Sequence, residues 1–327
     1  EGTDERNLIY IKRKKDKAYV PVIGEFKGSF RYLESKDNIL WFYTTYKAPK
    51  GKVVSLTLLD EDKFQWNDVV RESKETISSV NLVGNKIVIN YLRDTLSSIK
   101  LFNLSGKHHL DLEIEGQGTI QGFDGNLNEK YTFFEFENFV TPPKIYKLDL
   151  LTFKYDLFWQ MELPGYEDVE LTTTLKFFTS KDGTSIPIHI SHQAGSKIDN
   201  STPVLLYGYG GFNIPILPSF TKTFYTWMRE GGVLAVVNLR GGSEYGDSWH
   251  KQGMLLNKQN VFDDFAYAAK FLHSEDVGSS NTTVSLGRSN GGLLVAATML
   301  QYPVLFKVDI PKVGVLDILR FNKFTIG

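Results

Sequence analysis

The sequence of 327 residues contains no cysteine. This absence excludes disulfide bonds, zinc sites built from thiolates and catalysis by a thiol, and it is compatible with a cytoplasmic protein. There is also no apolar run of about 18 residues, so no membrane-spanning segment is expected. A formal net charge of −1, without a basic stripe, argues against nucleic acid or an anionic membrane surface as a partner.

Motifs for bound cofactors are missing as well. The glycine-rich segments at residues 207–213 and 240–246 fit neither the dinucleotide-binding fingerprint nor a phosphate-binding loop with its lysine. We therefore expect no cofactor and no metal ion.

Hydrophobic residues are abundant. They make up 42% of the sequence, and 13% of the residues are aromatic, which favours packed cores rich in strands. A chain of this length suggests two domains.

The first half of the sequence repeats. Short runs of β-branched and aromatic residues recur with spacings of 45, 45 and 47 residues, and a second, interleaved series has spacings of 48 and 44. Matching positions of the first series are Ile11, Leu56, Leu101 and Leu148. Repeats of about 45 residues with four short strands are typical of β-propeller blades. The sequence predicts a propeller portion over residues 1–163, with an open β-sandwich as the alternative.

Three complete blades are predicted, near residues 27–72, 74–116 and 117–162. The first residues supply only the last two strands of a fourth blade. Three and a half blades cannot close a ring and would leave strand edges unpaired. We therefore expect this sequence to be part of a longer protein.

In the second half, strands alternate with helices. Continuous apolar runs, such as residues 233–237, predict central strands covered on both faces. Residues 261–273 have a helical spacing of apolar side chains, with Asn260 as the expected N-cap, and a further strand is expected near residues 312–316. This order predicts an α/β domain over residues 164–327 with a mostly parallel sheet, whose functional groups lie at the carboxyl ends of the strands.

One stretch of this half, Gly287-Arg-Ser-Asn-Gly291, has the G-x-S-x-G pattern of a nucleophile elbow. A strand is predicted before it and a helix beginning at Asn290 after it, which is the context that the pattern requires. Glycine is expected on both sides of Ser289 because a Cβ there would collide with the neighbouring strand or helix. Patterns of five residues also arise by chance in a glycine-rich chain, so the support for this serine depends on the rest of the sequence.

Other polar residues of the second half have structural explanations. We expect Arg240 to pair with Glu244 or with an aspartate on the following helix, rather than to clamp a substrate carboxylate. Adjacent helical residues point about 100° apart, so Asp263 and Asp264 are expected to stabilise the first helical turn instead of binding a metal ion. His250 is expected to form structural hydrogen bonds, because it precedes the candidate nucleophile.

Several long motifs follow one another in a specific order after residue 170. They are Tyr207-Gly-Tyr-Gly-Gly-Phe-Asn-Ile214, Asn238-Leu-Arg-Gly-Gly-Ser-Glu-Tyr-Gly246, Trp249-His250, Asn257-Lys-Gln-Asn-Val-Phe-Asp-Asp-Phe265, Gly287-Arg-Ser-Asn-Gly-Gly-Leu-Leu-Val295 and Phe324-Thr-Ile-Gly327. Together they resemble the prolyl oligopeptidase family of serine peptidases. Oligopeptidase B is the nearest rival, but there we would expect alanine in place of Asn290 and a different tyrosine-glycine loop.

The resemblance implies part of an α/β-hydrolase domain joined to part of a seven-bladed β-propeller that excludes folded proteins. The implied activity is that of a serine endopeptidase that hydrolyses short peptides on the C-terminal side of proline. By motif, Ser289 is the nucleophile, and the hydroxyl of Tyr209 and the backbone N–H of Asn290 stabilise the oxyanion. The residues implied to form the apolar pocket for the proline ring are Phe212, Val315 and Ile326.

The histidine of the expected triad is missing from the sequence. α/β-Hydrolases place the acid and then the histidine after the nucleophile, yet all six histidines precede Ser289. The resemblance implies that the sequence stops before both residues and that this chain alone is inactive, with Asp317 as the alternative acid. A basic specificity like that of oligopeptidase B, or an inactive fragment with only a binding role, are the alternatives. The resemblance otherwise implies a cytoplasmic monomer that acts on short proline-containing peptides.

Overall fold

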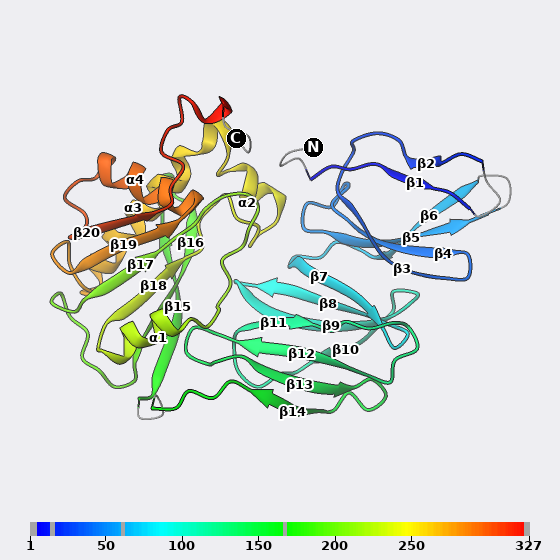
Figure 1. The fold of residues 1–327 in the computed structure, drawn as a ribbon, viewed down its shortest axis with the longest axis horizontal. Helices are drawn as coiled ribbons and strands as arrows, with labels where there is room; N and C mark the ends of the chain where they lie inside the picture. Colours follow the sequence, from blue (N-terminus) through cyan, green and yellow to red (C-terminus); the bar gives the residue numbers. More distant parts are fainter. Residues whose placement is uncertain (1–4, 14–16, 60–62, 166–168, 324–327) are drawn as a thin grey trace. The chain divides into compact units, whose positions relative to one another are not determined.

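The computed structural model describes residues 5–13, 17–59, 63–165 and 169–323. Contacts within the chain divide it into two compact units (Figure 1). Unit 1 comprises Glu1–Arg93, Ser97–Phe136 and Ile145–Trp159, and unit 2 comprises Asp94–Leu96, Glu137–Lys144 and Gln160–Gly327. Two short segments of the first half of the sequence therefore belong to unit 2.

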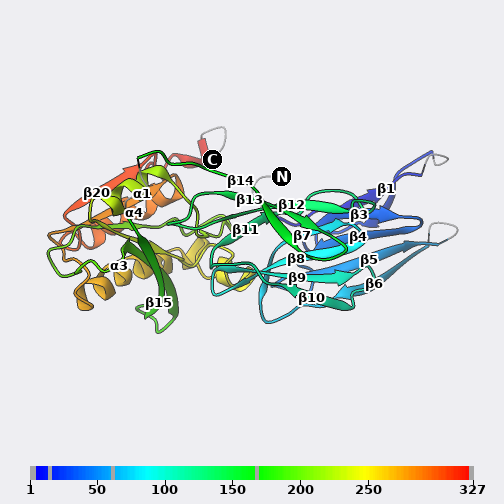
Figure 2. The ribbon, with the colours of Figure 1, turned by 90° about the horizontal axis from the view of Figure 1, so that it is seen from below.

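Unit 1 consists of sheets whose strands follow one another along the chain, in the orders β1-β2, β3-β4-β5-β6, β10-β9-β8-β7 and β11-β12-β13-β14 (Figures 1 and 2). The strands of the first two sheets are β1 (Ile9–Ile11), β2 (Val20–Ile23), β3 (Phe30–Lys36), β4 (Ile39–Thr44), β5 (Lys52–Leu58) and β6 (Phe64–Val70). Those of the other two are β7 (Thr76–Val83), β8 (Lys86–Arg93), β9 (Leu96–Asn103), β10 (His108–Leu112), β11 (Thr119–Gly122), β12 (Tyr131–Glu137), β13 (Lys144–Asp149) and β14 (Tyr155–Gln160). Each four-stranded sheet falls within one predicted blade.

Tight turns and alternating side chains explain these sheets. Asp37 connects β3 to β4 with a φ of 55°, and Gly84 and Asn85 connect β7 to β8 with φ values of 55° and 58°. Two-residue hairpin turns that match the strand twist need positive φ, which aspartate, asparagine and glycine adopt most easily. Along β12, Thr132, Phe134 and Phe136 are buried while the residues that alternate with them are more exposed. The period of two thus places one face of each strand in the core.

Unit 2 contains a six-stranded sheet in the order β15-β16-β18-β17-β19-β20. β15, β16 and β18 pair antiparallel, whereas β18, β17, β19 and β20 pair in parallel. The strands are β15 (Leu171–Thr179), β16 (Ser185–Gln193), β17 (Val204–Tyr207), β18 (Val233–Val237), β19 (Thr283–Arg288) and β20 (Val308–Lys312). The helices are α1 (Lys222–Arg229), α2 (Asp247–Lys251), η1 (Leu255–Asn257), α3 (Gln259–Ser274), α4 (Asn290–Gln301) and η2 (Phe321–Lys323). The predicted fold class, part of a propeller joined to a partial α/β domain, is confirmed.

Successive residues of β18 face opposite layers of unit 2. Ala235 and Val237 pack in a cluster with α3 and α4, whereas Leu234 and Val236 pack with Met228 of α1. All five side chains are at most 1% exposed. A strand covered on both faces needs apolar residues at every position, which explains its uninterrupted apolar sequence. The sheet is therefore a rigid support for the loops at the carboxyl ends of its parallel strands.

Two predictions about element boundaries were wrong. Asn260 is not the N-cap of α3, because the helix begins one residue earlier and the Nδ2 of Asn260 donates to the carbonyl oxygen of Gln252 at 2.9 Å. The strand expected near residues 312–316 ends at Lys312. Val313 has a φ of 43°, which the extended backbone of a strand does not allow.

None of the helices in the described ranges combines the length and the hydrophobicity that crossing a lipid bilayer requires.

Candidate active site

Ser289 lies in the turn between β19 and α4. Its φ of 57° and ψ of −118° are unfavourable for a residue that carries a Cβ. Neighbouring backbone holds this conformation: the Ser289 N–H donates to the carbonyl oxygen of Lys312 at 3.0 Å, and its carbonyl oxygen accepts from the N–H of Gly292 at 2.8 Å. The side chain itself is exposed. A strained, exposed serine between a strand and a helix has the geometry of a nucleophile elbow.

The glycines beside Ser289 are needed for steric reasons. A Cβ at Gly287 would lie 2.1 Å from the carbonyl oxygen of Gly291, and a Cβ at Gly291 would lie 2.6 Å from the carbonyl oxygen of Gly208. Both distances are too short for any side chain, because the obstacle in each case is backbone. The close approach that the sequence predicts is therefore present, and it brings the loop after β17 against the start of α4.

That loop places Tyr209 next to Ser289. Burial raises the pKa of Tyr209, and a hydrogen bond with the side chain of Ser289 opposes this rise. The phenol is therefore protonated at neutral pH and can donate a hydrogen bond. Asn290 is the first residue of α4, so its backbone N–H has no partner within the helix, and the helix dipole adds partial positive charge there. Tyr209, Ser289 and Asn290 thus meet at one place.

Lys258 also contacts these residues, although no sequence motif singles it out. Its Nζ donates to the carbonyl oxygen of Gly210 at 2.7 Å and to the Oδ1 of Asn290 at 3.1 Å. The Nδ2 of Asn290 in turn donates to the carbonyl oxygen of Tyr209 at 2.6 Å. A lysine between two helices has no distinctive pattern, so only its contacts reveal it.

The residues implied to bind the substrate side chain lie in loops around this place. Phe212 is 52% exposed, with a φ of 56°, in the loop after β17. Val315 is half-buried in the loop after β20, where the adjacent Gly314 packs against Gly292 of α4. Ile326 lies outside the described residues. The structure therefore places Phe212 and Val315 in the loops that follow two strands of the same sheet.

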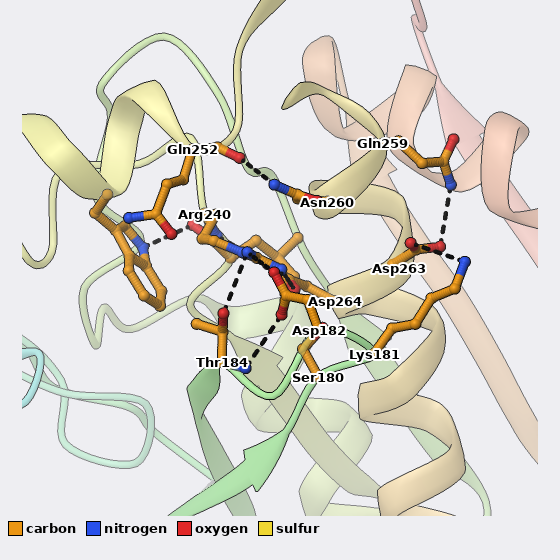
Figure 3. Close-up of polar contacts among 12 residues, drawn as sticks. Ser180, Lys181, Asp182, Thr184, Arg240, Gln252, Gln259, Asn260, Asp263 and Asp264 are labelled. Carbon is orange, nitrogen blue, oxygen red and sulfur yellow. Dashed lines mark hydrogen bonds and ion pairs between the residues drawn. The ribbon is translucent and has the colours of Figure 1, made fainter. Parts of the chain in front are cut away.

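A buried ion cluster lies beside the loop that carries Tyr209 (Figure 3). Arg240 follows β18 and donates from Nε and Nη2 to the two carboxylate oxygens of Asp264 on α3, at 2.9 and 2.6 Å. Its Nη1 donates to Asp182, in the turn between β15 and β16, at 2.5 Å. Ser180 donates to Asp264 at 2.5 Å. The cluster therefore ties together a strand end, a hairpin turn and a helix.

The charges of this cluster stabilise one another. Arg240 is 1% exposed and Asp264 is fully buried. The hydrogen bond from Arg240 is the main reason that the pKa of Asp182 is lowered to about 2. Burial lowers the pKa of Arg240, but the bonds to Asp264 and Asp182 outweigh this effect and raise it. The arginine is thus a structural ion-pair partner and does not face a substrate.

The sequence predictions for these charges were partly correct. The pairing of Arg240 with Asp264 is confirmed, whereas Glu244 is not its partner, and Asp182 was missed because it is distant in sequence. The first-turn explanation for Asp263 and Asp264 is wrong, because α3 begins at residue 259 and places them in its second turn. Asp263 instead accepts hydrogen bonds from neighbouring side chains, including Nε2 of Gln259 at 3.0 Å.

Glu244 is buried and has no positively charged partner among the described residues. Burial raises its pKa to about 7, although hydrogen bonds to its carboxylate oppose this shift. Its Oε1 accepts from the N–H of Ile216 at 2.9 Å and from the Nδ2 of Asn238 at 3.4 Å. Glu244 therefore fixes the segment that continues from the Tyr209 loop.

His250 has the structural role that the sequence predicts. Its Nδ1 lies 2.8 Å from the carbonyl oxygen of Gly241 and 3.1 Å from the backbone nitrogen of Asn213. These contacts join the two glycine-rich loops.

Asp317, the alternative acid, receives a hydrogen bond from Nε of Arg320 at 2.6 Å and so has a structural partner.

Comparison with known families accounts for both units. Residues 1–160 match the family described as "Prolyl oligopeptidase, N-terminal beta-propeller domain", and residues 218–326 match the "Prolyl oligopeptidase family". The chain belongs to the prolyl oligopeptidase family. The second match contains Ser289 and the loop that carries Val315.

Individual prolyl oligopeptidases and their relatives agree with this assignment. The prolyl endopeptidase of Elizabethkingia miricola is 39% identical over 322 residues, which cover 98% of this chain and 45% of that protein. The prolyl endopeptidase of Dictyostelium discoideum is 31% identical over 319 residues, covering 94% of this chain and 42% of that protein. The chain therefore spans less than half the length of the curated relatives it matches.

Solved structures of the family are similar throughout the chain. A structure from a study of two prolyl endopeptidases has a TM-score of 0.92 at 33% sequence identity, covering 100% of this chain and 48% of that one. Prolyl oligopeptidase B from Galerina marginata, bound to a 25mer macrocyclization substrate, has a TM-score of 0.91 at 28% identity, covering 99% and 46%. The likeness extends over both units of this chain.

Proposed function

We propose that the natural protein carrying this sequence is a serine endopeptidase that hydrolyses short peptides on the C-terminal side of proline. The proposal depends on the position of Ser289. This residue is exposed in a strained turn at the start of α4, and its side chain is hydrogen-bonded to Tyr209. Membership of the prolyl oligopeptidase family supports it, as do relatives named prolyl endopeptidases.

In the proposed reaction, the Oγ of Ser289 attacks the carbonyl carbon that follows the proline ring. The carbonyl oxygen becomes an oxyanion, which accepts hydrogen bonds from the hydroxyl of Tyr209 and the backbone N–H of Asn290. Collapse of the tetrahedral intermediate releases the amine of the C-terminal peptide and leaves an acyl-enzyme, which water then hydrolyses. Loss of one oxyanion donor typically costs about 3 kcal/mol of transition-state stabilisation.

The proton of Ser289 requires a general base. In α/β-hydrolases this base is a histidine that follows the nucleophile, oriented by a carboxylate. No histidine follows Ser289 in this sequence. The proposed activity is therefore that of the natural protein, and we expect the 327-residue chain alone to be inactive.

Selectivity for proline is assigned to the loops around Ser289. Phe212 and Val315 supply an aromatic and an aliphatic wall, and Ile326 is included by motif. A proline ring is compact and lacks an N–H, so apolar walls without a hydrogen-bond acceptor suit it. Exposure of Phe212 and the half-buried position of Val315 are compatible with such contacts.

We propose that the propeller excludes folded proteins, so that short proline-containing peptides are the substrates. Sheets in the order of propeller blades support this assignment. The absence of cysteine fits a reducing compartment, and we propose a cytoplasmic monomer.

The experiment compares the natural protein with its Ser289→Ala variant on peptides that carry proline, alanine or arginine before the cleaved bond. We expect the proline peptide to be preferred and Ser289→Ala to lower kcat by about 10⁴-fold or more, as removal of a serine nucleophile does elsewhere. The matched control is Ser274→Ala, at the exposed end of α3, which should retain full activity.

Each alternative has its own outcome. Retained cleavage in Ser289→Ala would remove the proposed mechanism, and preference for arginine would favour a specificity like that of oligopeptidase B. A fluorophosphonate probe tests the 327-residue chain by itself. Stoichiometric labelling of Ser289 together with turnover would contradict the expectation that this chain lacks its base.

A further inference from the structure

Lys258 is a half-buried lysine that the proposed reaction does not use. It lies between η1 and α3, and its ammonium lies 5.9 Å from the ring centre of Phe262. Burial lowers its pKa to about 8, so at neutral pH it is a charged group removed from much of its solvent. A buried ammonium is costly unless its N–H groups have acceptors. One acceptor of Lys258 belongs to Asn290, next to the nucleophile, and the other belongs to Gly210, next to Tyr209.

Its two hydrogen bonds join segments that are distant in sequence. One goes to the carbonyl oxygen of Gly210, in the loop after β17, at 2.7 Å, and the other goes to the Oδ1 of Asn290, on α4, at 3.1 Å. Asn290 then closes the network, since its Nδ2 donates to the carbonyl oxygen of Tyr209 at 2.6 Å. Both ends of the Asn290 amide are therefore used, which fixes its orientation.

The loop backbone is packed tightly against this hydrogen-bond network. A Cβ at Gly211 would lie 2.5 Å from the Nδ2 of Asn290, so the loop backbone rests directly against the amide. The loop carries the hydroxyl of Tyr209, and α4 carries the backbone N–H of Asn290. A shift of the loop relative to α4 would separate these two donors.

We propose that Lys258 is a positioning residue of the oxyanion site, which holds the Tyr209 loop against Asn290 so that both donors converge beside Ser289. Lys258 itself touches neither substrate nor oxyanion in this proposal. Donors fixed in advance stabilise the transition state more than donors that must reorganise, and misplacement of reacting groups by about 1 Å can cost about 100-fold in rate. The inference rests on the proposed function.

The test replaces Lys258 by methionine, which keeps an unbranched apolar stem beside Phe262 but removes all three N–H donors. In the natural protein, kcat on the proline peptide should fall on the order of tenfold to a hundredfold, because the oxyanion donors remain but are less well placed. KM and the affinity for the product peptide should change less than twofold. Affinity for a peptide aldehyde, which forms an oxyanion-like adduct with the serine, should fall in parallel with kcat.

Two further variants give the test its specificity. Lys270→Met, at an exposed lysine of α3, is the matched control and should retain full kcat. In a Tyr209→Phe background, Lys258→Met should lower kcat by much less than it does alone, because part of what it positions is already missing. Lys258→Gln, which keeps a shorter donor, should lose less kcat than Lys258→Met and replaces it if methionine prevents folding.

The outcomes separate the two proposals. Unchanged kcat in Lys258→Met, or losses that multiply fully with Tyr209→Phe, would overturn the role of Lys258. Equal losses in kcat and in product affinity, together with a lower Tm, would also overturn it and indicate a structural role. If Ser289→Ala retains activity on proline peptides, the proposed function itself fails, whatever the Lys258 variants do.

Discussion

The two units of the chain bury different kinds of side chain. Among the described residues, every buried Asp, Glu, His and Arg lies in unit 2. Buried polar groups of unit 1 are hydroxyls and an amide, such as Asn90, whose Nδ2 donates to the carbonyl oxygen of Ile120 at 2.7 Å. Its larger charged clusters, such as Glu75 with Arg93 and Lys100, keep contact with solvent.

This difference follows from what each unit has to hold in place. Propeller sheets need only apolar faces and short turns, because each strand pairs with its neighbour along the chain. Unit 2 must hold loops at the ends of strands that are distant in sequence. Buried charges are costly, but when paired they accept only one geometry, and breaking such a pair is strongly destabilising. The Arg240 cluster provides this fixed geometry at the carboxyl end of β18, beside the loop that carries Tyr209.

The largest effect is expected at Asp264. Replacing Asp264 by asparagine removes the charge that faces Arg240 and leaves the guanidinium with Asp182, which is partly exposed. The free energy of unfolding should fall by about 3–5 kcal/mol, the usual cost of breaking a buried ion pair. Urea denaturation of the natural protein measures this change.

Asp263→Asn is the matched control for this experiment. Asp263 is the next residue on the same helix, but its cationic partner Lys181 is mostly exposed, and asparagine can still accept the bond from Gln259. The expected loss is about 1 kcal/mol, because Lys181 is mostly exposed and solvent screens its charge. Equal losses in the two variants would show that the burial of the pair does not matter.

The difference between local pairing in unit 1 and long-range contacts in unit 2 also explains which parts of the fold could be predicted from the sequence. Strands of unit 1 follow from local turns and alternation, so the period of about 45 residues was sufficient to find its blades. In unit 2, the apolar runs at β17 and β18 and the pattern around Ser289 are equally local. Element boundaries that depend on tertiary contacts were predicted wrongly. For example, β20 ends before Val313, which has a left-handed backbone conformation, and a pattern of apolar residues does not reveal such a conformation.

The residues of the candidate site also fall into two groups, those marked by local sequence motifs and those known only from tertiary contacts. The G-x-S-x-G pattern singles out Ser289, and the resemblance of the surrounding motifs to the prolyl oligopeptidase family points to Tyr209 and Asn290. Lys258 and Asp182 were not found, because their role arises only when distant loops meet. A lone lysine or aspartate in a turn has many possible partners, and the fold selects one of them.

His189 provides the second prediction. It is 2% exposed, its Nε2 lies 2.7 Å from the Oγ1 of Thr95, and burial lowers its pKa from 6.5 to about 4. Between these values the unfolded chain binds more protons, so this residue contributes stability above about pH 6.5 that is lost as the pH falls to 4. The loss is up to about 3 kcal/mol. In His189→Gln, which cannot titrate, the unfolding free energy should fall less over this range.

Measurement of urea denaturation at pH 6.5 and pH 4 tests this, with the exposed His109→Gln of unit 1 as control. That variant should retain the acid sensitivity of the unmodified protein. If His189→Gln is as sensitive to acid as the unmodified protein, its burial does not control acid stability.

The smallest effect is expected at Glu75, in unit 1. Its Oε1 accepts from Nε of Arg93 at 2.7 Å and its Oε2 accepts from Nζ of Lys100 at 3.0 Å, but the Arg93 side chain is 63% exposed. Solvent screens such pairs, so Glu75→Gln should cost at most about 1 kcal/mol, and high salt should shrink the difference from the unmodified protein. Urea denaturation at low and high salt measures both. A salt-independent loss as large as that of Asp264→Asn would mean that the propeller also depends on fixed charges, and the contrast between the two units would no longer hold.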